Sequence, residues 1–179
     1  MNESTIQRKS IAQAVLLAML LTLLAYIAWF YIHESGHIGL ALVGHFMNNN
    51  LSSNITVVWM QLPILPISVP QRTHIDGQTL STVVYGGSYM AVFAAIVVYA
   101  IIQKWSNLRN KDYAILIPAV ILLHEYIGDY LCGTDNLTGN ALTDCRGVLW
   151  IVSVVSFYLL IPVIAFLIYP EIKKRVAKN

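Results

Sequence analysis

Four long apolar runs dominate this sequence of 179 residues. They cover residues 11–32, 80–103, 113–131 and 147–169, and each approaches the ~20 residues that a helix needs to cross a bilayer. The runs are continuous and lack the alternation of polar and apolar residues that marks the strands of a membrane barrel. They predict an all-α integral membrane protein with about four transmembrane helices, the first continuing as helix through Phe46.

The composition agrees with a membrane location. Hydrophobic residues make up 57% of the chain and charged residues 11%, about half of the ~25% that is usual in soluble domains. The net charge of +2 argues against a nucleic-acid partner and leaves the lipid bilayer as the expected surroundings. The length fits one membrane-embedded domain over residues 1–179.

The first apolar run has a second interpretation, a cleaved signal peptide, because Arg8 and Lys9 precede it. A signal core is typically 7–15 residues long and is followed by a small-residue A-x-A site. This run is longer and no such site follows, so we predict a retained helix.

Basic residues between the runs predict the orientation of the chain. Nine of them lie in the N-terminal segment, in the 104–112 turn and in the C-terminal tail, whereas the 47–79 and 132–146 segments hold only Arg72 and Arg146. The positive-inside rule then predicts a multi-pass protein with cytoplasmic N and C termini and with the two longer loops on the outer side.

The first outer loop contains a β-branched run, Ile55–Trp59, which predicts a short strand-like segment. The strand could pair with an extended substrate, or it could simply cover neighbouring residues. Pro63, Pro66 and Pro70 keep the following part extended and exclude it from a central strand.

The second outer loop is bracketed by Cys132 and Cys145. The outer compartment permits a disulfide between them, but cysteines in loops also remain free thiols, and the sequence leaves both possibilities open.

The motif that carries chemistry is His33-Glu34-Ser35-Gly36-His37, an H-E-x-x-H pattern at the outer end of the first run. Residues four apart share one helix face, so His33 and His37 can bind one zinc ion. Glu34 can reach a zinc-activated water and act as the acid/base. Chance predicts roughly 0.003 such patterns here, and an ionisable residue in an apolar helix costs about 2.5–3.5 kcal/mol. Both arguments favour a metal site over a chance pair of histidines beside a solvated glutamate.

A zinc enzyme of this kind needs a third protein ligand and an open position for water. The candidates lie late in the chain and are Asp135, then Asp129, then Glu125. His124 can orient a ligand carboxylate by hydrogen bonding to it. The alternative interpretation is that Asp135 caps a helix and Asp129 lies at the wet interface.

The segment His33–Gly44, HESGHIGLALVG, resembles the motif of the site-2-protease (M50) family of intramembrane zinc metalloproteases, in particular its M50B-like branch. Tyr85–Tyr89 is similar to the small-residue helix that follows the motif in that branch. The run Gly128–Asn136, followed by Gly147–Trp150, resembles its later aspartate-bearing segment, although Thr-Asp-Asn stands here in place of the usual Asn-Pro and Asp-Gly. Gly86 within the small-residue stretch is interpreted, with its neighbours, as a site of close helix packing.

The resemblance implies a zinc peptidase that cuts within or beside membrane helices, with His33, His37 and Asp135 as ligands of one Zn²⁺ per chain and Glu34 as the acid/base. Its substrate would be a membrane-protein or membrane-adjacent peptide segment.

Two rival functions remain: a non-catalytic metal-binding scaffold or pseudoprotease, and a small transporter that uses Glu34, Glu125 and Asp129 as a polar relay. The intact His-Glu-His set favours the enzyme, and the sequence shows no paired repeats of the kind that transporters have.

Overall fold

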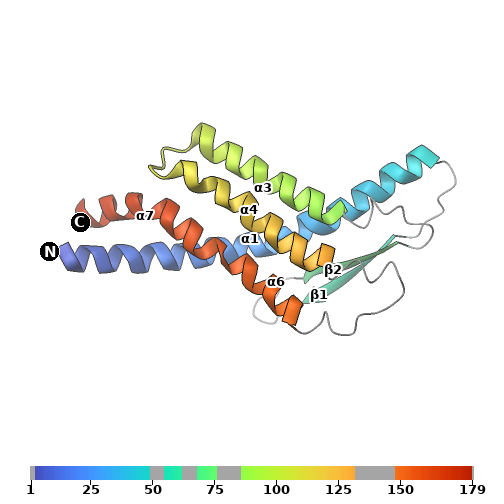
Figure 1. Cartoon of the computed structure of the whole chain (residues 1–179), viewed down its shortest axis with the longest axis horizontal. Helices are drawn as coiled ribbons and strands as arrows, with labels where there is room; N and C mark the ends of the chain where they lie inside the picture. The colour runs from blue at the N-terminus through green and yellow to red at the C-terminus, as the bar shows by residue number, and fades with distance from the viewer. Residues whose placement is uncertain (1–2, 49–54, 62–67, 76–85, 132–147, 179) are drawn as a thin grey trace. The chain divides into compact units, whose positions relative to one another are not determined.

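The computed structural model of the protein describes residues 3–48, 55–61, 68–75, 86–131 and 148–178 (Figure 1). The chain divides into two compact units, one made of Met1–Ala25 with Ala95–Asn179 and the other of Tyr26–Ala94. The single domain expected over residues 1–179 stays a prediction.

The first helix, α1, runs from Glu3 to Asn48 and confirms the prediction that the first apolar run continues as helix through Phe46. No proline interrupts it, and its first glycine is Gly36, so the Leu- and Ala-rich stretch before that keeps a high helix propensity. A stripe of small side chains at every fourth position is 0–2% exposed. These side chains let the first part of α1 pack closely within the unit of Met1–Ala25 and Ala95–Asn179. The stripe consists of Ser10, Ala14, Ala18 and Thr22.

Three helices of the described chain are long and apolar enough to cross a membrane: Glu3–Leu40, Gly86–Trp105 and Val154–Lys178. Gly86–Trp105 is α3. Large apolar side chains such as Leu16 and Phe93 remain 70% and 62% exposed on these helices, as expected for surfaces that face lipid. The mostly helical architecture is therefore confirmed.

The third apolar run is helical throughout but is divided among three helix types. The 3₁₀-helix η1 covers Lys111–Ile115, α4 covers Leu116–Glu125, and a π-helix, η2, covers Tyr126–Leu131. Pro118 lies in the first turn of α4, where a missing backbone N–H is tolerated because it has no partner within the helix. The fourth membrane span stays a prediction.

The last apolar run is broken into α6, Val148–Tyr158, and α7, Leu160–Lys178. The N–H of Leu159 donates to the carbonyl of Ser156 over 3.1 Å, which closes a tighter turn than an α-helix does. Pro162 explains the break, because it has no N–H to donate to the carbonyl four residues earlier.

A two-stranded antiparallel sheet belongs to the unit Tyr26–Ala94. Strand β1, Ile55–Gln61, covers the β-branched run, and it pairs with β2, Ser68–Ile75, which the sequence did not reveal. The register shifts between Val58 and Trp59, where β2 contains Pro70. A proline is tolerated there because both strands are edge strands and because the shift interrupts the ladder of hydrogen bonds.

The core of the other unit is formed where α4 packs against α6 and α7. Phe157 and Leu160, on either side of the break between α6 and α7, are 1% and 2% exposed. Val120 and Ile121 are the buried apolar side chains of α4. This packing places the polar residues of α4 inside the unit.

Candidate metal centre

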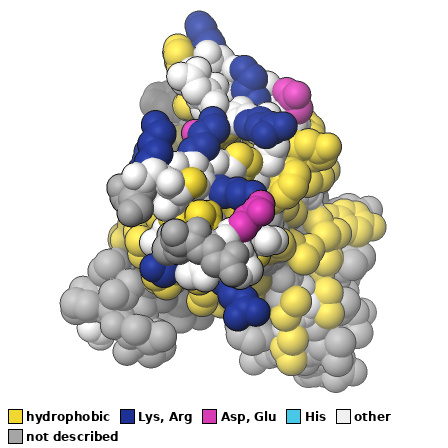
Figure 2. Space-filling view, turned by 90° about the vertical axis from the view of Figure 1, so that its left-hand side faces the viewer, with side chains coloured by type: hydrophobic (Ala, Val, Ile, Leu, Met, Phe, Trp, Pro, Cys, Tyr) yellow, Lys and Arg dark blue, Asp and Glu magenta, His cyan; other side chains and the backbone are white. Residues whose placement is uncertain are grey.

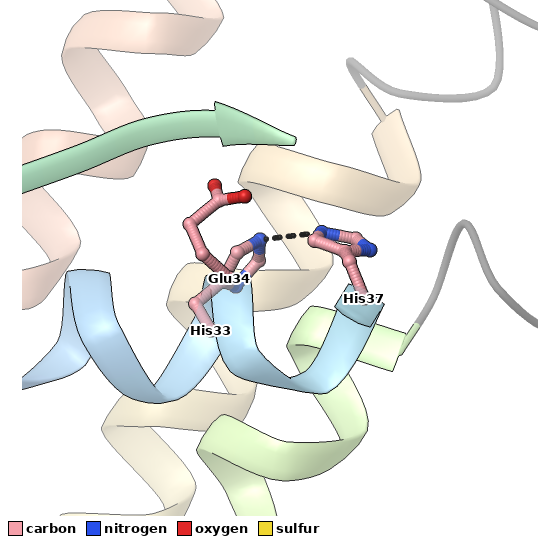
Figure 3. A group of neighbouring side chains, drawn as sticks. All are labelled: His33, Glu34 and His37. Carbon is pink, nitrogen blue, oxygen red and sulfur yellow. Dashed lines mark hydrogen bonds between the residues drawn. The ribbon is translucent and has the colours of Figure 1, made fainter. Parts of the chain in front are cut away.

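The two histidines of the H-E-x-x-H motif stand one turn apart on α1. Four residues of regular helix bring the chain back to the same side, and the Nε2 atoms of His33 and His37 lie 3.2 Å apart. The ring centroids are 4.9 Å apart and the ring planes meet at 74°. Figure 3 shows the two rings turned so that these nitrogens face each other.

The nitrogen pair has the spacing of two ligands on one zinc ion. Zinc binds imidazole nitrogens at about 2.0–2.1 Å with tetrahedral angles, which separates two such nitrogens by roughly 3.3–3.4 Å. The observed 3.2 Å between His33 and His37 is close to that separation. With a carboxylate oxygen of Glu34, these nitrogens form a set whose atoms all lie within 4.8 Å of one another. Among the residues that the structure describes, no other group of three metal-binding side chains is this close.

Glu34 is buried together with His33, and each of the two side chains is 6% exposed. Its carboxylate lies on the same side of α1 as the imidazoles of His33 and His37 (Figure 3). An ionised carboxylate only accepts hydrogen bonds, so it can take a proton from a water molecule held beside the imidazoles and release it later. The geometry therefore suits a general base.

An aromatic cluster lies on the preceding turns of α1. The ring of Trp29 is 5.0 Å from the ring of His33, measured between centroids. Tyr26 and Phe30 complete the cluster, with centroids 5.8 and 4.9 Å from that of Trp29. Such packing restricts the rotation of the imidazole and excludes water from one side of it. The sequence pattern did not single out Trp29, although it stands four residues before His33 and therefore on the same helix face.

The start of α3 packs against the motif segment of α1. The backbones of Gly36 and Gly86 are so close that a Cβ added to either one would overlap the other. Only glycine permits this approach, and the interpretation of Gly86 as a close-packing residue is confirmed.

The next residue, Gly87, faces the imidazoles themselves. A Cβ added to Gly87 would lie 2.5 Å from Nε2 of His33 and 2.6 Å from Nε2 of His37. Both distances are well below van der Waals contact, so a side chain at this position would displace the rings. Gly39, on the same segment of α1, has nothing within 4 Å of an added Cβ. The sequence shows that residue 87 is small but does not reveal which side chains it faces.

Tyr31, two residues before His33, contacts both strands of the sheet. Its hydroxyl donates a 2.6 Å hydrogen bond to the backbone carbonyl of Ser68, the first residue of β2. Its ring centroid lies 6.4 Å from that of Trp59 on β1. Both strands are therefore anchored next to the motif.

The candidates for the third ligand lie elsewhere in the chain. Glu125 is the last residue of α4 and is 3% exposed, and Asp129 lies in η2, so both belong to the other unit. Asp135 lies outside the described residues, as do Cys132 and Cys145. The identity of the third ligand and the state of the two cysteines stay predictions.

His124 is buried at 4% exposure in the same unit as Glu125. Its Nδ1 lies 3.5 Å from the hydroxyl of Ser156 on α6, and its ring centroid lies 5.2 Å from that of Phe157. These contacts join α4 to α6. The expected role of His124 in orienting a ligand carboxylate stays a prediction.

Comparison of the chain with protein-family models, with curated proteins and with solved structures finds no match. The resemblance to site-2 proteases therefore depends on the sequence motifs alone.

Proposed function

We propose that this protein is an intramembrane zinc metalloendopeptidase that hydrolyses peptide bonds within or next to transmembrane segments of membrane proteins. The observation that carries the proposal is the group of buried His33, buried Glu34 and half-buried His37, in which two facing nitrogens have the separation of zinc ligands. Three helices of suitable length and composition support a membrane location.

His33 and His37 would hold one Zn²⁺ through their Nε2 atoms. A carboxylate is the third ligand, with Asp135 as the first choice and Asp129 and then Glu125 as the alternatives. A bound zinc ion supplies a Lewis acid that polarises the scissile carbonyl and lowers the pKa of a water molecule toward ~7.

Glu34 moves the proton. One of its carboxylate oxygens accepts the proton of the attacking water, and the same group then delivers that proton to the nitrogen of the leaving amine. Trp29 and Gly87 keep the His33 ring in the orientation that this step requires, since the first packs against the ring and the second leaves space for it. Burial keeps bulk water away from the carboxylate and strengthens its interactions with the substrate.

The substrate is a segment of membrane protein that is extended at the cleavage site, because the backbone of an intact helix hides its peptide bonds. The positive-inside pattern gives a multi-pass topology with both termini cytoplasmic and with the motif toward the outer side of the membrane. A substrate segment would therefore be cut near the outer end of its helix.

The test compares wild-type protein with Glu34→Gln after purification in detergent. Zinc is measured by mass spectrometry, and cleavage is measured with fluorescent casein and with a panel of labelled transmembrane peptides. We expect about one zinc per chain in both proteins and a cleavage rate about 10²–10⁴-fold lower in Glu34→Gln, because only the proton transfer is removed.

Glu3→Gln is the matched control, since it makes the same exchange on an exposed glutamate of the same helix, and it should leave cleavage unchanged. Wild-type protein without zinc would disprove the metal site. Zinc-loaded wild-type protein that cuts none of these substrates, or Glu34→Gln that cuts as fast as wild type, would disprove the enzyme and favour the scaffold.

A further inference from the structure

Basic side chains gather at one end of the unit formed by Met1–Ala25 and Ala95–Asn179. Three segments supply them: residues 3–10 of α1, residues 104–113 from the end of α3 into η1, and residues 170–178 of α7. Figure 2 shows their Lys and Arg side chains crowded on one face. This surface is called the basic end, and its nine cations are Arg8, Lys9, Lys104, Arg109, Lys111, Lys173, Lys174, Arg175 and Lys178.

Hydrogen bonds hold the middle segment of the basic end in place. The side-chain amide of Gln103 donates to the carbonyl of Lys111 over 2.7 Å, and the ammonium of Lys111 donates back to the carbonyl of Gln103 over 3.1 Å. Asn110 donates to the carbonyl of Phe166 on α7 over 3.1 Å, and the ring of Tyr113 packs against Phe166 with centroids 5.2 Å apart. The turn between α3 and η1 is thus closed and attached to α7.

The basic end carries more positive charge than the whole chain does. Its three segments hold nine basic side chains but only Glu3, Asp112 and Glu171 as acids, which gives +6 against +2 for the complete sequence. Glu171 is already paired with Lys174 over 3.0 Å. All the basic side chains except Lys111, which is half-buried, are exposed. The result is a concentrated positive surface in contact with solvent.

Exposed aromatic side chains border this positive surface. Trp105 is 69% exposed and Tyr113 is 55% exposed, and the ammonium of Lys104 lies 5.0 Å from the centroid of the Trp105 ring. Ile101, one turn before Trp105 on α3, and Ile11, two residues after Lys9 on α1, are large apolar side chains that are 44% and 47% exposed. Apolar side chains followed along the surface by aromatic rings and then by ammonium groups are typical of a membrane–water interface. A surface that binds nucleic acid has no such apolar belt.

We propose that the basic end binds the headgroups of anionic phospholipids. Clusters of four to eight Lys and Arg beside a membrane helix attract acidic lipids, and the four cations of residues 173–178 alone form such a cluster. The inference rests on the membrane location in the proposed function and is independent of the proteolytic activity.

The test measures lipid binding to the full-length protein in detergent by native mass spectrometry. The probes are phosphatidylglycerol and phosphatidylcholine with the same acyl chains. We expect phosphatidylglycerol to bind at least about tenfold more tightly, and the preference to weaken between low salt and about 0.5 M salt, where screening is strong. Neutralising the tail with Lys173→Gln, Lys174→Gln, Arg175→Gln and Lys178→Gln should remove most of that preference.

The matched control exchanges Lys173, Lys174 and Lys178 for arginine, which keeps the charge and should keep the preference. Arg8→Gln with Lys9→Gln is the second test, and it should weaken the preference by a smaller factor. Equal binding of the two lipids, or an undiminished preference in both neutralised proteins, would overturn the inference. Thermal stabilisation by inorganic phosphate equal to that by phosphatidylglycerol would also overturn it, because it indicates a site for free anions. Binding of a single-stranded oligonucleotide more tightly than phosphatidylglycerol would overturn it as well. Wild-type protein that fails to insert into phosphatidylcholine vesicles would overturn the membrane location itself, and a loss of proteolysis alone would leave this inference standing.

Discussion

The described residues include two buried His-Glu pairs in apolar helices, and among these residues the pair on α1 alone belongs to a close group of three side chains that could hold a metal ion. His33-Glu34 on α1 and His124-Glu125 on α4 are equally well buried, at 3–6% exposure. Four residues after His33 the chain has His37, whose Nε2 faces that of His33, but four residues after His124 it has Gly128. Burial of a histidine beside a glutamate is therefore common to both pairs, and the second imidazole one turn later gives His33 the spacing of a candidate zinc ligand.

The helices that carry the two pairs also differ. α1 continues as regular α-helix to Asn48, which preserves the four-residue relation after His33. α4 ends at Glu125 and gives way to the π-helix η2, while the imidazole of His124 turns to Ser156 and Phe157 of α6. His33 is spaced to share a metal ion with His37, whereas His124 contacts a second helix.

The largest expected difference between the two pairs is in zinc content. His37→Ala removes one of the two facing nitrogens, and we expect it to lower bound zinc from about one ion per chain to nearly none, because a zinc enzyme site needs three protein ligands. His124→Ala leaves both nitrogens of α1 in place and should lower bound zinc much less. Mass spectrometry of the metal in the two purified proteins measures the difference.

The result for His124→Ala also bears on the third ligand. A 10–100-fold loss of zinc affinity in that protein is the effect of removing a residue that orients a ligand carboxylate. It would identify the acidic residues of α4 and η2, Glu125 or Asp129, in place of Asp135, and it would mean that the two pairs form one site.

A smaller effect is expected at the glycines. Gly87→Ala puts a Cβ against both imidazoles, and we expect zinc affinity to fall about 10–100-fold, as it does when the support of a ligand is disturbed, while the protein stays folded. Gly39→Ala is the control, because its Cβ enters open space and alanine is the better helix former. Zinc titration of the two proteins, with circular dichroism for the fold, measures the effect. Equal zinc affinity in both would show that residue 87 has no influence on the imidazoles.

Much of the metal centre follows from local spacing, which explains why the sequence was informative there. The period of the helix brings His33, Glu34 and His37 to one side of it. The helix itself is predicted by a long apolar run without proline. The π-helix after Glu125 was not predicted, since an apolar run in the sequence looks the same whichever helix type it adopts.

Contacts between distant residues could not be predicted from the pattern. Gly87 lies against the imidazoles, and the hydroxyl of Tyr31 donates to the carbonyl of Ser68. Both contacts result from the packing of the unit Tyr26–Ala94, and no local spacing in the sequence predicts them. β2 was overlooked for a related reason: Pro70 argues against a central strand, but it is tolerated in a sheet that has only two strands. The break at Leu159 did have a local signal in Pro162, which the continuous hydropathy of the run concealed.

The smallest expected effect concerns the hydroxyl beside each pair. Ser156→Ala removes one contact of His124, and we expect a loss of about 0.5–1 kcal/mol of stability with zinc unchanged, because polar contacts between helices in membranes average about 0.6 kcal/mol and this one is long at 3.5 Å. Ser35→Ala, inside the H-E-x-x-H motif, removes an exposed hydroxyl that donates to the carbonyl of Ile32 on its own helix, and its effect should be within a few tenths of a kcal/mol. Thermal unfolding in detergent measures both. If Ser156→Ala lowered zinc binding and left stability unchanged, the contact on α4 would serve the metal centre, and the distinction between a metal-binding pair and a helix-joining pair would be wrong.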